Sequence, residues 1–327
     1  MRVWLLQSLN GLALGGLLFL LSSGFSLIFG LMRVANLTHG AYFASQIVIA
    51  AVFALSLNLL VGYAGLTSLG HAAYLGGAAY VAAWLTTKAG AGHLAAAITA
   101  LALTVAMAAV FGVLALRGTG LTFLMITLAL AQILWGLAYR WVSLTGGDNG
   151  LSGITRPQPF GVDLSSPHAF YVFTLAVAAL VFTGVERLVH SPFGAGIAGC
   201  RDQPRRMSAL GYNVWLTQWV TFVVAGFGAG VAGLLFVYYN QFVGPPVLAL
   251  TSSAEGLLMV IAGGAATLAG PVVGAVLVVV LKNVVSAYVT RWVMLLGVVF
   301  VLIVVFMPQG IVPGLGRLWR WRSRSTD

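Results

Sequence analysis

Long apolar runs separated by short polar breaks make up almost the whole chain. Runs of about 20 apolar residues are long enough to cross the hydrocarbon core of a bilayer as helices. They predict spans at roughly 4–31, 45–61, 72–87, 93–116, 120–142, 168–187, 215–239, 255–268, 271–287 and 291–307. The eighth run is short, and Gly263-Gly264 and Gly270-Pro271 indicate a broken or re-entrant helix pair there. The pattern predicts an all-α polytopic membrane protein with about ten transmembrane or re-entrant helices.

One polar break occurs twice. The stretches "GLMRVANLTHGAYF" (30–43) and "GYAGLTSLGHAAYL" (62–75) align without a gap, so that His39 matches His71. Small residues in both copies would let helices approach closely, and internal repeats in transporters often flank the transport path. The alternative is that each histidine is a hydrogen-bonded residue at a membrane interface. The candidates for the transport path or the repeat breaks are Asn36, His39, Asn58, Ser68 and His71.

Glu255 is a further candidate for the transport path. It opens the eighth segment, and an acidic residue at a membrane edge indicates a functional site by default. The other interpretation is that Glu255 caps the N-terminus of its own helix through the helix dipole.

Composition excludes several classes of protein. Of the 327 residues, 60% are hydrophobic and only 7% are charged, whereas a soluble domain carries about a quarter charged residues. The single cysteine, Cys200, excludes an intrachain disulfide and a multi-thiolate metal site within one chain. The chain has no nucleotide-binding loop of the G-x-x-x-x-G-K-[ST] kind, so an energy source would come from outside it. We expect no cofactor and no metal.

The charge of the chain bears on its topology. Its net charge is +10, from 16 Lys and Arg against 6 Asp and Glu. The basic residues lie singly or in short groups between spans, which is typical of topology signals and of contacts to anionic lipid headgroups rather than of nucleic-acid binding. With ten crossings, the two dense basic clusters fall on one side; with nine, the basic tail would lie outside. The positive-inside rule therefore favours ten crossings and two cytoplasmic termini.

The inner segment 186–213 predicts a short free-standing helix. Asp202 or Gln203 can cap a helix whose first residue is Pro204, and Gly211 supplies a left-handed stop. The helix spans Pro204 to Leu210 and has an apolar side. It either links two spans or docks in a groove on a cytoplasmic partner. The residues concerned are Arg201, Asp202, Pro204, Arg205, Arg206, Ala209, Leu210 and Gly211.

The outer segment 143–168 is the second long connection. Its stretch "LTGGDNGLSGI" has flexible glycines and the polar pair Asp148 and Asn149, as expected of a loop that meets a partner or ligand. The alternative is an ordinary polar surface loop.

Five motifs follow one another across about 46–320: "LNLLVGYAGLTSLGHAAYLGGAAYVAAWL" (57–85), "TGGDNGLSGI" (145–154), "SPFGAGIAGCRDQPRRMSALGYNV" (191–214), "EGLLMVIAGGAATLAGPVVGA" (255–275) and "FMPQGIVPGL" (306–315). Together, and in this order, they resemble the LivM-type permease family, the membrane subunits of ATP-binding-cassette (ABC) importers for branched-chain amino acids and related small solutes. The resemblance implies the ABC importer permease fold. It also implies a second, LivH-type permease, two ATPase subunits and a periplasmic solute-binding protein. The helix around Ala209-Leu210-Gly211 matches the family's ATPase-coupling loop.

The N-terminus departs from this pattern. Residues 5–43 look more like the opening of the sister LivH-type permease, which would explain why the break occurs twice. A fusion, an internally deleted two-permease gene and a natural variant would each give this order. The resemblance therefore implies a LivH-like span over 1–44, a LivM-type transmembrane domain over 45–320 and a basic cytoplasmic tail over 321–327, in a bacterial inner membrane.

Three functions suit a polytopic membrane protein of this composition. An importer permease has no catalytic chemistry of its own. A secondary carrier driven by an ion gradient would place ionisable residues in the middle of the membrane, and only Glu255 and Glu186 approach that. An intramembrane enzyme would need clustered catalytic residues, but the five histidines are scattered. With the resemblance, the importer leads.

Overall fold

The computed structural model describes residues 37–158, 163–285, 292–307 and 309–314. The chain divides into two compact units, Met1–Ala41 and Tyr42–Asp327, and the contacts below lie within the second. In chain order the elements are α2 (Leu37–Asn58), η1 (Leu59–Tyr63), α3 (Ala72–Thr87), α4 (His93–Ala115), α5 (Leu121–Arg140), α6 (Val142–Thr145), η2 (Gly147–Asn149), β1 (Leu151–Ser152), α7 (Pro167–Val189), α8 (Pro192–Asp202), α9 (Pro204–Ala209), α10 (Val214–Asn240), β2 (Phe242–Val243), η4 (Pro245–Leu248), α11 (Leu250–Gly263), α12 (Gly270–Val280), η5 (Leu281–Val285) and α14 (Trp292–Phe306).

The helices confirm a polytopic membrane protein. Five stretches of the described chain are long and apolar enough to cross a membrane: Gly40–Tyr63, His93–Ala115, Leu121–Arg140, Pro167–Val189 and Val214–Asn240. Shorter apolar helices follow, including Leu250–Gly263 and Gly270–Asn283. The broken helix pair expected near residue 264 is present as α11 and α12. The predicted first span, 4–31, lies outside the described residues, so the count of ten remains a prediction.

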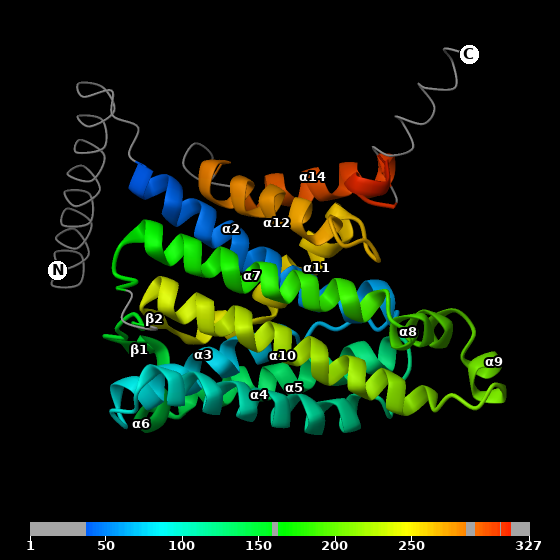
Figure 1. Cartoon of the computed structure of the whole chain (residues 1–327), viewed down its shortest axis with the longest axis horizontal. Helices are drawn as coiled ribbons and strands as arrows, with labels where there is room; N and C mark the ends of the chain where they lie inside the picture. Colours follow the sequence, from blue (N-terminus) through cyan, green and yellow to red (C-terminus); the bar gives the residue numbers. More distant parts are fainter. Residues whose placement is uncertain (1–36, 159–162, 286–291, 308, 315–327) are drawn as a thin grey trace, which may run out of the picture. The chain divides into compact units, whose positions relative to one another are not determined.

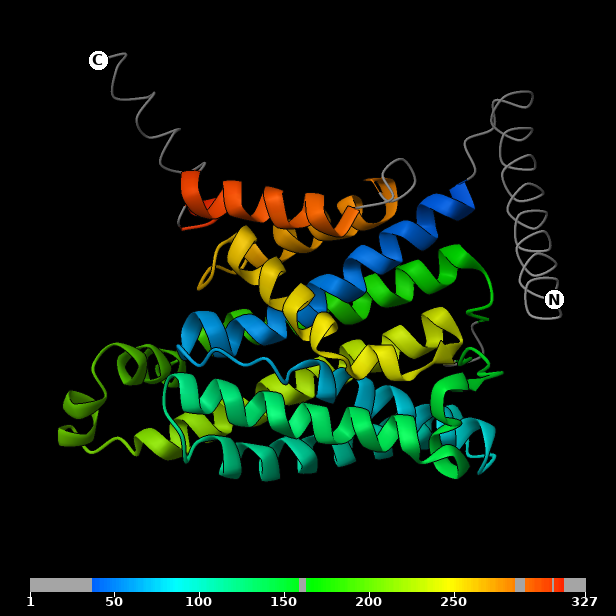
Figure 2. The ribbon, with the colours of Figure 1, turned by 180° about the vertical axis from the view of Figure 1, so that it is seen from behind.

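The two long connections lie at opposite ends of the helices (Figure 1). At one end, Arg156 binds the Tyr42 hydroxyl near the start of α2 and the carbonyl of Tyr238 near the end of α10. At the other end, Arg201 in α8 donates to the carbonyl of Gly62 at the end of η1. We call these the Arg156 end and the Arg201 end. Seen from behind, α8 and α9 extend beyond the ends of the neighbouring helices (Figure 2).

Helix α10 packs against both α3 and α4 and carries much of the core. Its small residues make this contact close: a side chain at Gly233 would collide with the carbonyl of Leu75 in α3. The Phe222 ring meets the Tyr74 ring edge-on, with centroids 5.8 Å apart. Trp219 donates from its indole nitrogen to the carbonyl of Ala109 in α4 at 2.9 Å. A glycine-rich helix in lipid thus replaces large apolar contacts with close backbone approach.

The second copy of the polar break explains why α3 is short. After η1 the chain turns at Gly65, which has a φ of +70°, and returns to His71, which is fully buried. Ser56 Oγ donates to the carbonyl of Phe53 at 2.7 Å, so His71 Nε2 donates to Ser56 Oγ at 2.9 Å. Ser56 lies seven residues, about two turns, before the end of the continuous helix formed by α2 and η1, so α3 begins among the other helices rather than at their ends.

The first copy of the break differs from the second. Residues from Leu37 to Phe43 are already helix, so His39 lies in the first turn of α2, whereas His71 immediately precedes α3. The two histidines share a position near a helix N-terminus. Asn36 lies outside the described residues.

Candidate functional site

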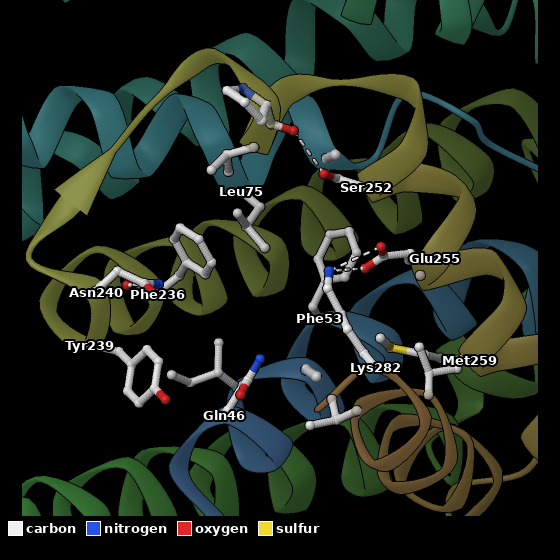
Figure 3. Close-up of a pocket in the computed structure, with 18 residues that line it drawn as sticks. Gln46, Phe53, Leu75, Phe236, Tyr239, Asn240, Ser252, Glu255, Met259 and Lys282 are labelled. Carbon is white, nitrogen blue, oxygen red and sulfur yellow. Dashed lines mark hydrogen bonds and ion pairs between the residues drawn. The ribbon is translucent and has the colours of Figure 1, made fainter. Parts of the chain in front are cut away.

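A cavity of about 290 Å³ lies between α2, α3, α10, η4, α11, α12 and η5. Tyr239 and Asn240 line it where α10 finishes at the Arg156 end, and Ala72 lines it at the start of α3. Most of the wall is apolar, and the side chains in Figure 3 show Phe53, Phe236 and Met259 around the space. The remaining apolar lining residues are Ile49, Ala50, Leu75, Pro246, Val247, Gly256, Val278 and Val279.

An ion pair crosses this cavity. Lys282 Nζ lies 3.0 Å and 2.9 Å from the two carboxylate oxygens of Glu255 (Figure 3). The side chain of Glu255 is 27% exposed and that of Lys282 is 43% exposed. The pair is therefore partly buried, and because its two charges are opposite it adds no net charge to the cavity.

Both charges lie well away from the turn between α11 and α12. The turn between α11 and α12 is at the Arg201 end, because Asn58 holds Ala266 and Thr267 there. Counting from the helix residues next to this turn, at about 1.5 Å a residue, Glu255 is about 12 Å and Lys282 about 18 Å along their helices. Since a bilayer core is about 30 Å thick, we expect the pair to lie near its middle when the permease is in a membrane.

The structure corrects the position expected for Glu255 and the cap that it was expected to form, while its place in the transport path stays a prediction. The structure begins α11 at Leu250, with Ala249 at the N-cap and no side-chain cap bond. Glu255 therefore lies in the second turn, away from a membrane edge, and its carboxylate binds Lys282 instead of the start of its own helix. The sequence carried no direct signal for this pairing, because Glu255 lies 8 residues before the end of α11 whereas Lys282 lies 12 residues after the start of α12.

Further polar groups line the cavity. Gln46 Oε1 accepts from Asn283 Nδ2 at 3.2 Å, and Ser252 Oγ donates to the carbonyl of Pro246 at 2.9 Å. Asn240 Nδ2 donates to the carbonyl of Phe236 at 3.0 Å. An apolar wall with a few polar groups and a central ion pair is suited to a small solute that has both apolar and charged parts.

The other predicted path residues lie elsewhere. Asn58, Ser68 and His71 are fully buried, and none of them lines the cavity. Asn58 accepts from the amide of Ala266 at 3.0 Å and donates to the carbonyl of Thr267 at 2.9 Å. Ser68 Oγ accepts from the amide of Gly70. These three side chains hold the break and the α11–α12 turn in place.

The inner loop forms two helices, α8 and α9, separated at Gln203. Gln203 is the N-cap of α9 but makes no side-chain cap bond. Asp202 ends α8, and its carboxylate accepts from Arg201 Nε at 2.7 Å, so Asp202 does not cap α9. This bond from Arg201 holds the pKa of Asp202 below its usual value. Arg201 Nη1 also donates to the carbonyl of Gly62 at 2.6 Å. Its guanidinium is therefore bound within the chain, where we expected contacts with a partner.

Helix α9 has no buried residue, and Met207 is its one half-buried residue. Pro204, Arg205, Arg206 and Ala209 all face outward, and Leu210, which follows the last helical residue, is 68% exposed. The predicted stop is present: Gly211 has a φ of +90°, and Tyr212 donates its amide to the carbonyl of Met207 at 3.0 Å. The unpaired donors and acceptors of the helix end are thus satisfied locally.

The outer loop is a compact turn with little room for backbone freedom. Asp148 and Asn149 are exposed within η2. Behind them, Leu151 pairs with Val243 in a short antiparallel ladder. A side chain at Gly150 would collide with the carbonyl of Val243, and its φ is +64°. The glycines that suggested flexibility therefore serve tight turns and close backbone approach.

A comparison with family models decides the identity. Residues 41–305 match the family described as "Branched-chain amino acid transport system / permease component". The chain belongs to this family. The permease is thus a transport subunit and a multi-pass membrane protein.

Curated relatives agree with this assignment. The high-affinity branched-chain amino acid permease protein LivM of Escherichia coli is 27% identical over 299 residues, covering 83% of this chain and 69% of the relative. LivM of Salmonella typhimurium is 26% identical over 293 residues, with the same coverage. LivH of Escherichia coli is 22% identical over 321 residues, covering 94% of this chain and 95% of the relative. No solved structure matches the permease.

Proposed function

We propose that the permease is a membrane subunit of an ABC importer that carries branched-chain amino acids, or related small polar solutes, into the bacterial cytoplasm. It works with a LivH-type permease as a heterodimer, two ATP-binding-cassette subunits that hydrolyse ATP, and a periplasmic solute-binding protein. The subunit lies in the inner membrane with both termini cytoplasmic, in contact with lipid. The names of its relatives support the solute class.

The observation that carries the proposal is the exposed helix α9 at the Arg201 end. A six-residue helix with no buried residue has no core of its own, and its exposed Leu210 offers an apolar surface that a partner can cover. Arg205 and Arg206 offer charge-assisted hydrogen bonds to acidic groups of such a partner.

Helix α9 is also connected to the spans. A side chain at Gly199 in α8 would collide with the Met207 side chain, so the two helices touch closely there. Arg201 then joins α8 to Gly62. A movement of an ATPase against α9 would therefore reach the break that precedes α3.

A carrier driven by an ion gradient is the alternative. Its coupling would use a mid-membrane acid that takes up and releases a cation. Glu255 is at the right depth, but Lys282 already neutralises it at 2.9 Å. This pairing favours the importer.

We further propose that 1–44 is a LivH-like element, that 45–320 is the LivM-type domain and that 321–327 is a basic cytoplasmic tail. The LivH relative covers more of the chain than the LivM relatives do, 94% against 83%. The boundary between the compact units, after Ala41, falls close to residue 44. At the Arg156 end, the exposed Asp148 and Asn149 are proposed to meet the solute-binding protein.

A crosslinking experiment tests the proposal. In a Cys200→Ser background, Ala209→Cys in the assembled complex should form a crosslink to an ATPase subunit. Asn149→Cys is the matched control, since it lies at the other end, and it should crosslink to the solute-binding protein but not to the ATPase. Absence of the Ala209 crosslink, or equal crosslinking of the ATPase to both positions, would contradict the proposed docking.

A further inference from the structure

The ion pair in the cavity needs an explanation beyond structural support. Charged side chains near the middle of a membrane are costly, and where they occur they face a cavity and serve a function. Glu255 and Lys282 come from different helices, both line the cavity, and they meet across it. Two apolar side chains of similar size would join α11 and η5 without this cost.

The chemistry of the pair matches one class of solute. An α-amino acid carries an ammonium and a carboxylate on one carbon and has no net charge at neutral pH. Its ammonium can take the place of Lys282 at the Glu255 carboxylate, and its carboxylate can take the place of Glu255 at the Lys282 ammonium. This exchange replaces one ion pair with two, so it leaves neither partly buried charge unpaired. A solute with a single charge would leave one of them without a partner.

The wall of the cavity suits an aliphatic side chain. Phe53, Phe236 and Met259 lie around the ion pair (Figure 3). The volume of about 290 Å³ is at the low end of the range for small-molecule pockets. The polar residues Gln46 and Asn240 lie toward the Arg156 end, on the way from that end to the ion pair.

We propose that this cavity is a transit binding site for zwitterionic amino acids with aliphatic side chains. Glu255 binds the α-ammonium and Lys282 binds the α-carboxylate. The inference rests on the proposed transport function and adds to it a selective site inside the permease. Such a site favours zwitterions over amides, urea, dicarboxylates and diamines, because only a zwitterion satisfies both charges at once.

The test measures binding to the whole complex in lipid nanodiscs, without the solute-binding protein. Three radiolabelled probes are compared: L-leucine, 3-methylbutan-1-amine, which lacks the carboxylate, and 4-methylpentanoate, which lacks the ammonium. In the unmodified complex, leucine should bind about tenfold or more tightly than either analogue, since each analogue leaves one charge unpaired.

Two substitutions separate recognition from structural support. Glu255→Gln should weaken leucine binding about tenfold or more and leave 4-methylpentanoate binding unchanged or stronger. Lys282→Met should likewise weaken leucine binding about tenfold or more, but leave the binding of 3-methylbutan-1-amine unchanged or stronger. A pair that only holds α11 and η5 together predicts that all three probes weaken equally. The double variant Glu255→Gln with Lys282→Gln keeps polar contact without a lone charge, and it should lose the preference for leucine.

Matched controls lie outside the cavity. Glu186→Gln removes an exposed acid on α7, and Lys88→Met removes an exposed base after α3; both should bind leucine normally. Leucine binding that stays within about twofold in Glu255→Gln and Lys282→Met would overturn the site. A complex that binds leucine through these residues but shows no ATP-driven uptake would instead overturn the importer and leave the site standing.

Discussion

The link between Arg201 and Gly62 gives a quantitative prediction about coupling. Arg201→Met keeps the aliphatic stem, whose Cγ packs against Gly65, and removes the guanidinium that binds the Gly62 carbonyl at 2.6 Å. A hydrogen bond from a charged group contributes about 1.5–3 kcal/mol. Because the Arg201 side chain is 34% exposed, solvent screening reduces this to about 1–2 kcal/mol.

That energy sets the expected effect. Each 1.4 kcal/mol corresponds to about a tenfold change in an equilibrium. If the bond exists in only one of the transport states, its loss should lower the amount of amino acid imported per ATP hydrolysed by about 5–30-fold. The assay is uptake and ATP hydrolysis measured together in proteoliposomes that hold the whole complex. ATP hydrolysis itself should continue, because the proposed ATPase sites are on other subunits.

A matched variant isolates the bond. Asp202→Asn removes only the exposed pair with Arg201, which solvent screens strongly, and keeps the bond to Gly62. It should change the ratio less than Arg201→Met does. An unchanged ratio in Arg201→Met, or an equal fall in Asp202→Asn, would refute the reasoning.

Three further predictions concern the helix stop, the break and the topology. Gly211→Val should uncouple uptake from ATP hydrolysis while membrane insertion stays normal, because a side chain at φ +90° is strained by about 1 kcal/mol or more. Gly184→Val, at an exposed position of α7, is the control. Normal uptake by Gly211→Val would contradict this prediction. Asn58→Leu should destabilise the protein by about 2–4 kcal/mol, since it leaves the amide of Ala266 and the carbonyl of Thr267 without partners. Thermal unfolding measures this, with Asn240→Leu at an exposed position as the control, and equal stability of the two variants would disprove it. Membrane-impermeant reagents should label Thr38→Cys and Thr67→Cys from opposite sides; labelling of both from one side would exclude ten crossings.

Features set by local sequence were predictable. The apolar runs gave the positions of α4, α7 and α10 because lipid requires long hydrophobic helices whatever they pack against. The stop at Gly211 could also be predicted, since a left-handed residue after a short helix depends on nearby chain only. The helix start was less certain, and the suggestion of Asp202 as its cap was wrong because Arg201 already binds that carboxylate.

Features set by distant contacts were not predictable. The start of α3 at Ala72 depends on Ser253, 181 residues away, whose Oγ accepts from the amide of Ala72 at 3.0 Å. The partner of Arg201 is a carbonyl 139 residues away. An apolar periodicity carries no information about either contact. Glu255 was selected from its type and position, but its partner Lys282 was counted only as a topology charge.

Three hydrogen bonds, Arg201 to Gly62, His71 to Ser56 and Ala72 to Ser253, form a continuous route from the exposed helices to the cavity. Arg201 joins α8 to the end of η1, His71 returns from that end to Ser56, and Ala72 binds Ser253, which stands two residues before Glu255. Spatial contact of this kind does not by itself transmit a change; each link must have two states whose balance is altered at both ends. The links here are single hydrogen bonds across separate segments, and the His71 ring also meets the Tyr74 ring edge-on, with centroids 5.7 Å apart, so a change at the break would reach the packed core as well. The bond of Arg201 to Gly62 is the one closest to the proposed ATPase, so a change in coupling on its removal is the first evidence to seek that the route is used.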